Sequence, residues 1–186
     1  MKKVLPILLL LISGSVSKAQ NSWGILSLED YATIKIINDQ YSQSMSLTDI
    51  DKQPINGNWS QLNLLGVGLP ACSTNEYTGT ECYIRKPGIE IYYSNQLGGF
   101  MMGKLTITNI NFGFKIKGQL IKIGDDVSKL LSVHSDAYSK RQKVRSRTID
   151  DHQVLLHLAE TGVAISFRYD PQTNCITMIR VSQSIV

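Results

Sequence analysis

Apolar and polar positions alternate along the second half of the chain, and this pattern predicts antiparallel strands. Between positions 163 and 169, Val, Ile, Phe and Tyr alternate with Ala, Ser and Arg, which is the period of a half-buried strand. The segments 89–93, 101–117, 154–158 and 175–181 show related patterns and predict further strands. Because short, turn-rich loops join successive segments, the sequence predicts an antiparallel meander.

A strand followed by a short helix is predicted in the stretch 119–136. The strand covers 120–123 and ends at Gly124, after which Asp125 or Asp126 stands where a helix N-cap belongs. One apolar face of the helix is indicated by Val127, Leu130, Leu131 and His134, spaced i, i+3, i+4 and i+7.

The beginning of the chain is harder to interpret. Ser27 followed three residues later by Asp30 predicts a capped helix start. Helical spacing of the apolar residues then favours a helix over 28–38, although Ile34 and Ile36 also alternate as in a strand. Residues 41–59 are polar, and Pro54 and the Asn56-Gly57-Asn58 segment indicate turns within them.

Two parts of the chain match one another. Gly88–Tyr93 corresponds in residue type to Gly162–Phe167, and Ile107–Ile110 corresponds to Ile176–Ile179, with a slip in the apolar spacing that suggests a shared β-bulge. Matches this short arise by duplication or by chance, because strands draw on few residue types. The predicted fold is α+β, an antiparallel meander with short helices and, as one option, two tandem helix-plus-sheet units. The expected units are an N-terminal α+β unit at 20–117 and a C-terminal helix-plus-sheet unit at 118–186.

A family resemblance rests on the strand 120–123, the following Gly-Asp-Asp-Val-Ser-Lys-Leu-Leu segment, and the strands at 162–167 and 176–179. This order resembles the helix-then-sheet layout of the group of BamE, an outer-membrane assembly lipoprotein, and the β-lactamase-inhibitor proteins. It covers roughly 120–184, with a fainter match over 62–112. The resemblance implies antiparallel sheet units, two in tandem in the inhibitor proteins, and a binding or scaffold role without catalytic residues. The chain lacks the lipobox Cys of BamE, so a lipid anchor is not expected.

The first residues predict export. Lys2 and Lys3 precede an apolar run at 4–12, and Ser17 and Ala19 provide small residues at the −3 and −1 positions of a signal-peptidase site. We therefore expect a signal peptide at 1–19 and a periplasmic or extracellular protein. Stable membrane insertion is not expected, because a spanning helix needs about 20 apolar residues.

Charge gives little support to nucleic acid as a partner. The chain has 19 basic and 15 acidic residues, and Lys2, Lys3 and Lys18 lie in the signal segment, so the remainder is nearly balanced. A basic run at 140–147 is compatible with an anion-binding patch. The preferred interpretation is a solvated edge strand, because no aromatic residue interrupts the run for base stacking.

The three cysteines predict one disulfide. Cys72 and Cys82 flank a turn-rich segment, and in an oxidising compartment they are expected to pair. Cys175 is then left over inside an apolar strand pattern and is expected to be a buried, inert thiol. No His or Cys ligands stand near it at metal-binding spacing, so no metal site is predicted.

No catalytic constellation stands out. His134, His152 and His157 lie outside any recognisable metal or nucleophile motif, and the pair Asp125 and Asp126 is better explained by helix capping than by paired catalytic carboxylates. The sequence therefore predicts no enzymatic activity and no cofactor.

The predicted function is binding of another protein, as an inhibitor or an envelope scaffold. Glu90, Tyr92 and Arg168 are the candidate partner-binding residues, because each alternates away from the apolar face of its strand. Arg85 is expected to lie near Glu90. The alternative is a small-ligand binder or hydrolase whose site assembles from scattered residues. A deep polar pocket with convergent carboxylates or histidines would favour this alternative, and a broad sheet bearing aromatic residues would favour protein binding.

Overall fold

Two β-sheets account for most of the fold, in a computed structural model that describes residues 24–56, 59–76, 79–95, 101–143, 152–158 and 162–183. The strands of the large sheet are β1 (Gly24–Leu26), β4 (Ala71–Asn75), β5 (Gly79–Lys86), β6 (Ile89–Ser94), β7 (Met101–Ile107), β10 (Gln142–Lys143), β11 (His152–Leu158), β12 (Val163–Tyr169) and β13 (Ile176–Gln183). The small sheet contains β2 (Lys35–Asn38), β3 (Gln43–Ser46), β8 (Phe112–Ile116) and β9 (Gln119–Lys122). The helices are α1 (Leu28–Thr33), α2 (Leu47–Asn56), α3 (Ser60–Leu64) and α4 (Ser135–Ser139), with 3-10 turns η1 (Asp39–Tyr41) and η2 (Val127–Leu131).

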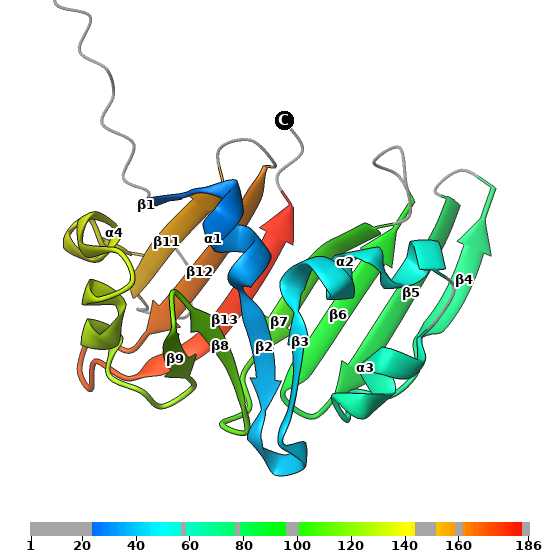
Figure 1. Ribbon diagram of the computed structural model, residues 1–186, viewed down its shortest axis with the longest axis horizontal. Helices are drawn as coiled ribbons and strands as arrows, with labels where there is room; N and C mark the ends of the chain where they lie inside the picture. Colours follow the sequence, from blue (N-terminus) through cyan, green and yellow to red (C-terminus); the bar gives the residue numbers. More distant parts are fainter. Residues whose placement is uncertain are drawn as a thin grey trace, which may run out of the picture.

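The large sheet has nine strands, eight of them in the order β1-β11-β12-β13-β7-β6-β5-β4, and β10 pairs with β11 beside this path. β1 lies parallel to β11, whereas the other neighbours in this sheet are antiparallel. The small sheet is antiparallel, in the order β3-β2-β8-β9. Figure 1 shows the small sheet and helices α1 and α2 lying across one face of the large sheet.

One hydrophobic core fills the space between these layers. The large sheet contributes Val163, Ile165, Phe167 and Tyr169, each at most 3% exposed, which confirms the alternation predicted for this strand. Burial of these side chains on one face fixes the register of β12, since a slip of one residue would exchange its two faces. The opposite layer contributes Ile34, Ile36, Leu47, Ile50 and Phe114.

The predicted α+β class is wrong. The described part of the chain is mostly β, with 53% of these residues in strands and 21% in helices, and the large sheet is mixed because of the parallel strand β1. β9 pairs with β8 and β13 pairs with β7 across the expected boundary at 117/118, so each sheet contains strands from both expected units. The exposed edges that β7 and β13 would otherwise present are removed by their pairing with one another.

The helix predicted over 28–38 is half as long as expected. Ser27 is the N-cap of α1 and forms a reciprocal capping box with Asp30, as predicted. α1 then ends at Thr33, and the next residues form β2, whose Ile36 is 1% exposed in the core. Hydrogen bonds to β3 and β8 on either side therefore outweigh the weak helical spacing. The polar stretch 41–59, where turns are predicted at Pro54 and at 56–58, contains β3 and α2, and Pro54 lies within α2.

The stretch 119–136 has the predicted order of strand and helix in a modified form. Asp126, one of the two predicted alternatives, is the N-cap. Its side chain accepts a hydrogen bond of 2.7 Å from the backbone N–H of Ser128. The helix is a five-residue 3-10 turn, and of its predicted apolar stripe Val127 and Leu130 are buried, whereas Leu131 is 48% exposed. His134 instead caps the separate helix α4.

On one side of the β7–β13 pair follow β6, β5 and β4, and on the other follow β12 and then β11, with which both β1 and β10 pair. In the small sheet, β3 and β9 flank the β2–β8 pair. The sequence matches noted above fall on β6 and β12 and on β7 and β13, which hold corresponding places. The expected bulge is present in β13, where Thr177 is the extra residue. The matching segment 107–110 does not form a bulge in β7, because this strand ends at Ile107. The bulge of β7 lies earlier, with Gly103 as the extra residue.

Candidate functional site

The outer face of the large sheet, which points away from the core, carries the three candidate partner-binding residues. Its side chains come from alternate positions of β5, β6, β7, β13, β12 and β11, and antiparallel pairing aligns them in rows across the strands. The first row is Arg85, Glu90, Thr106, Arg180, Ser166 and Leu155; the second is Tyr83, Tyr92, Lys104, Ser182, Ala164 and His157. Glu81, Arg168 and Met178 flank these rows.

Glu90 is the centre of an ion-pair network on this face. Its carboxylate lies 3.1 Å from Lys104 Nζ and 3.4 Å from Arg85 Nε, so it joins β5, β6 and β7 through their side chains. The hydrogen bond from Lys104, followed by that from Arg85, holds the pKa of the Glu90 carboxyl below its usual range. Glu90 is thereby neutralised by cations of the protein itself.

Beside this network lies a pair of tyrosines. The rings of Tyr83 and Tyr92 are 4.8 Å apart between centroids, and the Arg85 guanidinium lies 4.5 Å above the Tyr83 ring. The Tyr92 hydroxyl donates a hydrogen bond of 2.9 Å to Glu81, and burial, then this acceptor, raises the pKa of Tyr92. These contacts hold two aromatic surfaces in fixed positions, which lowers the entropy lost when a partner covers them.

On the other side of β7, two arginines lie near one another, and within the described part of the chain neither forms an ion pair with a carboxylate. Arg180 on β13 pairs with Ser166 and Arg168 on β12 pairs with Met178, so the two are diagonal neighbours on the same face. Arg168 Nε, Arg180 Nε and the hydroxyl oxygen of Thr106 are buried and have no hydrogen-bond partner. Burial, followed by the positive charge of Arg168, lowers the pKa of the Arg180 guanidinium. An arginine remains charged under such conditions, so this part of the face keeps a concentrated positive charge.

The structure brings the predicted residues to one face but not into one contact. Glu90 and Tyr92 lie in adjacent rows on β6, and Arg85 contacts Glu90 as expected. Tyr92 instead bonds to Glu81, and Arg168 lies on β12, separated from β6 by β7 and β13. Arg180 was missed, although its alternation with the buried residues Ile179 and Val181 carried the signal.

Ser166 is less accessible than its place on the outer face predicts. It points away from the core, as expected from the alternation, but it is only 9% exposed, while Arg168 is half-buried. Its cross-strand neighbours are the much larger Leu155 and Arg180, and a short side chain between two long ones is largely covered by them. The part of this face available to a partner is therefore formed by the longer side chains.

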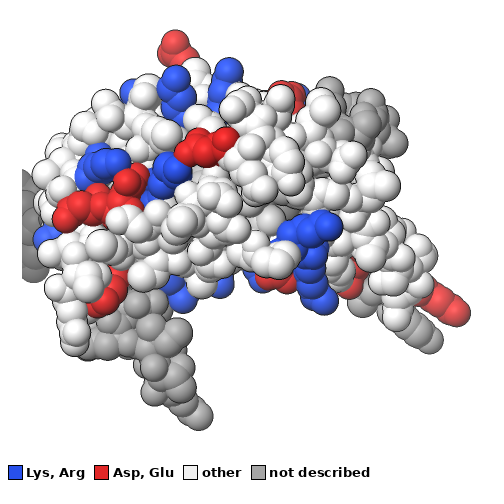
Figure 2. All heavy atoms as spheres, turned by 90° about the horizontal axis from the view of Figure 1, so that it is seen from below, with Lys and Arg blue, Asp and Glu red and all other residues white. Residues whose placement is uncertain are grey.

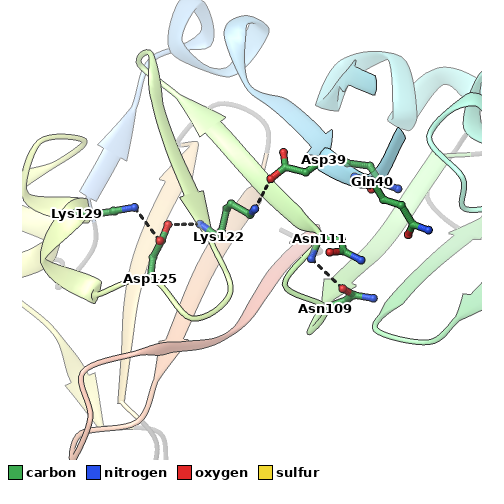
Figure 3. Close-up of polar contacts among 8 residues, drawn as sticks. Asp39, Gln40, Asn109, Asn111, Lys122, Asp125 and Lys129 are labelled. Carbon is green, nitrogen blue, oxygen red and sulfur yellow. Dashed lines mark hydrogen bonds and ion pairs between the residues drawn. The ribbon is translucent and has the colours of Figure 1, made fainter. Parts of the chain in front are cut away.

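A second polar cluster lies where the hairpins of the small sheet meet η2 (Figure 3). Asp39 is ion-paired with Lys122, and Asp125 accepts a hydrogen bond of 2.7 Å from Lys129 and another from the backbone N–H of Lys122. Nearby, the Asn109 side chain accepts from the backbone N–H of Asn111. These contacts join η1, β9 and η2, so Asp125 and its neighbour Asp126 are occupied by stabilising the turn.

The histidines are occupied by structural contacts. His134 accepts through Nδ1 from the backbone N–H of Ala137 at 3.3 Å, and His152 packs edge-on against Tyr169, with ring centroids 5.7 Å apart. His157 lies on the outer face. Among the described residues, no three His, Cys, Asp or Glu side chains are grouped so as to hold a metal ion.

The predicted disulfide is confirmed. Cys72 and Cys82 occupy directly paired positions of β4 and β5 and are joined by a disulfide, which is compatible with an oxidising, exported compartment. Cys175 is a free thiol, but it is half-buried and precedes β13, so its predicted place within a strand is wrong. The expected signal peptide and the second half of the basic run, from 144 to 147, lie outside the described residues.

A shallow depression extends the outer face toward β4. It has a volume of about 480 Å³, and its lining includes the exposed Leu69 together with Tyr83, Arg85 and Lys86. The lining contains neither a carboxylate nor a histidine, so it lacks the convergent groups expected of a hydrolase site. Within the described part of the chain, no helix is both long and apolar enough to cross a bilayer.

Comparison of the chain with models of protein families, with curated proteins and with solved structures finds no match. Figure 2 shows basic and acidic side chains interspersed over the side seen from below, without a continuous field of one sign. The functional argument therefore rests on the local arrangement of the outer face.

Proposed function

We propose that the protein is exported, is not an enzyme, and acts by binding another protein through the outer face of the large sheet. The observation that carries the proposal is the set of side chains aligned across six strands of the outer face. There Glu90 is bound by Arg85 and Lys104, whereas among the described residues Arg168 and Arg180 form no ion pair with a carboxylate. Tyrosine and arginine are the side chains that most often anchor protein interfaces.

Three features support this proposal over a small-molecule site. The outer face is broad, its tyrosines are held by neighbouring contacts, and the depression beside it lacks carboxylates and histidines. Export is supported by the signal-like sequence of residues 1–19 and by the Cys72–Cys82 disulfide. The resemblance to the BamE and inhibitor-protein group agrees with a binding or scaffold role.

The test compares capture by two tyrosine variants. The processed protein is immobilised and used to capture proteins from the periplasmic or culture extract of its own source, in wild-type form and as Tyr92→Ala and Tyr41→Ala. Tyr41 lies in η1, is 51% exposed and serves as a matched control away from the outer face. We expect a discrete partner to be retained by wild type and Tyr41→Ala and lost with Tyr92→Ala, while all three proteins keep their melting transition. Equal capture by both variants would exclude the outer face as the binding surface.

A further inference from the structure

The outer face is unevenly charged, although the chain beyond the signal segment is nearly neutral. Its carboxylates are Glu81 and Glu90, and both are occupied: Glu81 accepts from Tyr92, and Glu90 is bound by Lys104 and Arg85. The cations outnumber them: Arg85, Lys104, Arg168 and Arg180.

The surplus charge is concentrated at Arg168 and Arg180. Each of these arginines adds to the positive potential at the other; burial, and after it the charge of Arg168, lowers the pKa of Arg180. Glu90 also influences Arg180 across β7, but its oxygens are already held by Lys104 and Arg85. Among the described residues, neither arginine forms an ion pair with a carboxylate, and the Nε atom of each lacks an acceptor.

Both side chains are half-buried, which makes them better suited to bind an anion than freely exposed cations are. Arg180 lies between Ser166 and Thr106 in its row, and its Nη2 approaches Met178 Sδ at 3.7 Å. Because partial burial already restricts the rotamers of these side chains, less conformational entropy is lost when they bind a partner. Partial burial also strengthens charge-assisted hydrogen bonds to an incoming acceptor. The planar guanidinium matches a carboxylate in two-point geometry.

We propose that Arg168 and Arg180 together receive an acidic side chain, Asp or Glu, of the protein that docks on the outer face; this inference rests on the proposed function. The neighbouring surface favours a protein as the source of the carboxylate. Tyr83 and Tyr92 lie on one side, Met178 and Leu155 on the other, and such mixed aromatic and apolar surroundings match the core of a protein interface. A nucleic acid or anionic bilayer would call for a longer row of unpaired cations.

The experiment measures binding of poly-L-glutamate to the processed protein, and compares it with heparin, a non-protein polyanion whose charge comes mainly from sulfate groups. The variants are Arg168→Gln and Arg180→Gln, and the control is Lys115→Gln, an exposed cation on β8 in the small sheet. We expect each arginine variant to bind poly-L-glutamate roughly 5-fold more weakly, because it loses one charge-assisted contact at a half-exposed site. The affinity of the control should be unchanged. Heparin binding should be weaker and insensitive to the two arginines.

Equal weakening by Lys115→Gln would show bulk attraction and overturn the proposal, as would heparin binding through the same arginines with equal strength. Should an arginine variant fail to fold, the wild-type protein gives the answer by NMR. The Nε–Hε signals of Arg168 and Arg180 should then shift on addition of poly-L-glutamate, while that of Arg141 does not; shifts at Arg141 alone would contradict the proposal. If the arginines prove dispensable while Tyr92→Ala still loses its partner, this inference fails and the proposed function stands.

Discussion

Arg180 lies directly opposite Thr106 where β13 pairs with β7, and both the Nε of the arginine and the hydroxyl oxygen of the threonine are buried without a hydrogen-bond partner. This strand pair joins the two halves of the large sheet. Buried polar groups are ordinarily paired, so unpaired groups at the centre of a sheet need an explanation. Our explanation is that this surface is completed by a binding partner.

The hydroxyl of Thr106 offers a direct test of its unpaired state. Thr106→Val keeps the shape and β-branching of the side chain and removes the buried hydroxyl, so we expect unfolding stability to stay equal or to rise by about 1 kcal/mol. Thr108→Val, at an exposed position just after β7, is the control and should lie within about 0.5 kcal/mol of wild type. Urea unfolding gives both values, and a clear loss of stability for Thr106→Val would mean that the hydroxyl is paired in solution.

The two faces of β12 should respond differently to truncation. Phe167 is 0% exposed in the core, so Phe167→Ala should cost roughly 3–5 kcal/mol. Ser166→Ala, one residue away on the outer face, should change stability by no more than about 0.5 kcal/mol. Denaturant unfolding measures both variants, and similar losses for the two would contradict the register assigned to this strand.

The strand β12 is among the features of the fold that could be predicted from the sequence. The alternation at 163–169, the cap at Ser27 and the Cys72–Cys82 pair were predictable because each depends on residues close together along the chain. The pairing of β7 with β13 was not predictable, because the two strands are about 70 residues apart and their local patterns do not indicate which strands pair. The candidate site was only partly predictable for the same reason. Alternation located Glu90, Tyr92 and Arg168 on outward positions, but the unpaired state of Arg180 depends on neighbours from other strands.

The helix α2 and strand β3 were missed for a different reason. Residues 43–46 contain a single apolar side chain, Met45, which is too little for a periodicity to be recognised. β3 forms because it pairs with β2, and α2 because Leu47 and Ile50 enter the core opposite the large sheet. In both cases tertiary contacts, rather than local propensity, determine the structure.

The cysteine pairing can be checked chemically. Mass mapping of peptides from the non-reduced protein should find Cys72 joined to Cys82 and Cys175 as a free thiol. Replacing both paired cysteines by Ala should cost on the order of 2–3 kcal/mol, because the closed loop no longer restricts the unfolded chain. A disulfide that contains Cys175 would disprove this assignment.

A buried carboxyl should give the protein a defined pH response. Asp51 in α2 accepts hydrogen bonds from the backbone N–H of Met102 at 3.0 Å and from Gln183 Nε2 at 3.3 Å. Burial raises the pKa of Asp51, so the folded protein holds its proton more readily than the unfolded chain does. The carboxyl therefore opposes folding increasingly as pH rises through its folded pKa.

Asp51→Asn retains an acceptor for Met102 and removes the charge. We expect the stability of this variant relative to wild type to increase between about pH 3 and about pH 7, as measured by denaturant unfolding at several pH values. Asp49→Asn, which removes the charge of an exposed neighbour in the same helix, is measured alongside as the control. A difference between Asp51→Asn and wild type that stays constant with pH would show that Asp51 is not desolvated in solution.

The central claim, that the outer face binds a protein, is tested most directly by site-specific photo-crosslinking in the cells that produce the protein. A benzophenone amino acid replaces Lys104 on the outer face or, as the control, Lys115 on the small sheet. Our account predicts one discrete protein adduct from position 104 and none from position 115. An adduct from position 115 alone, or the same set of adducts from both positions, would contradict it.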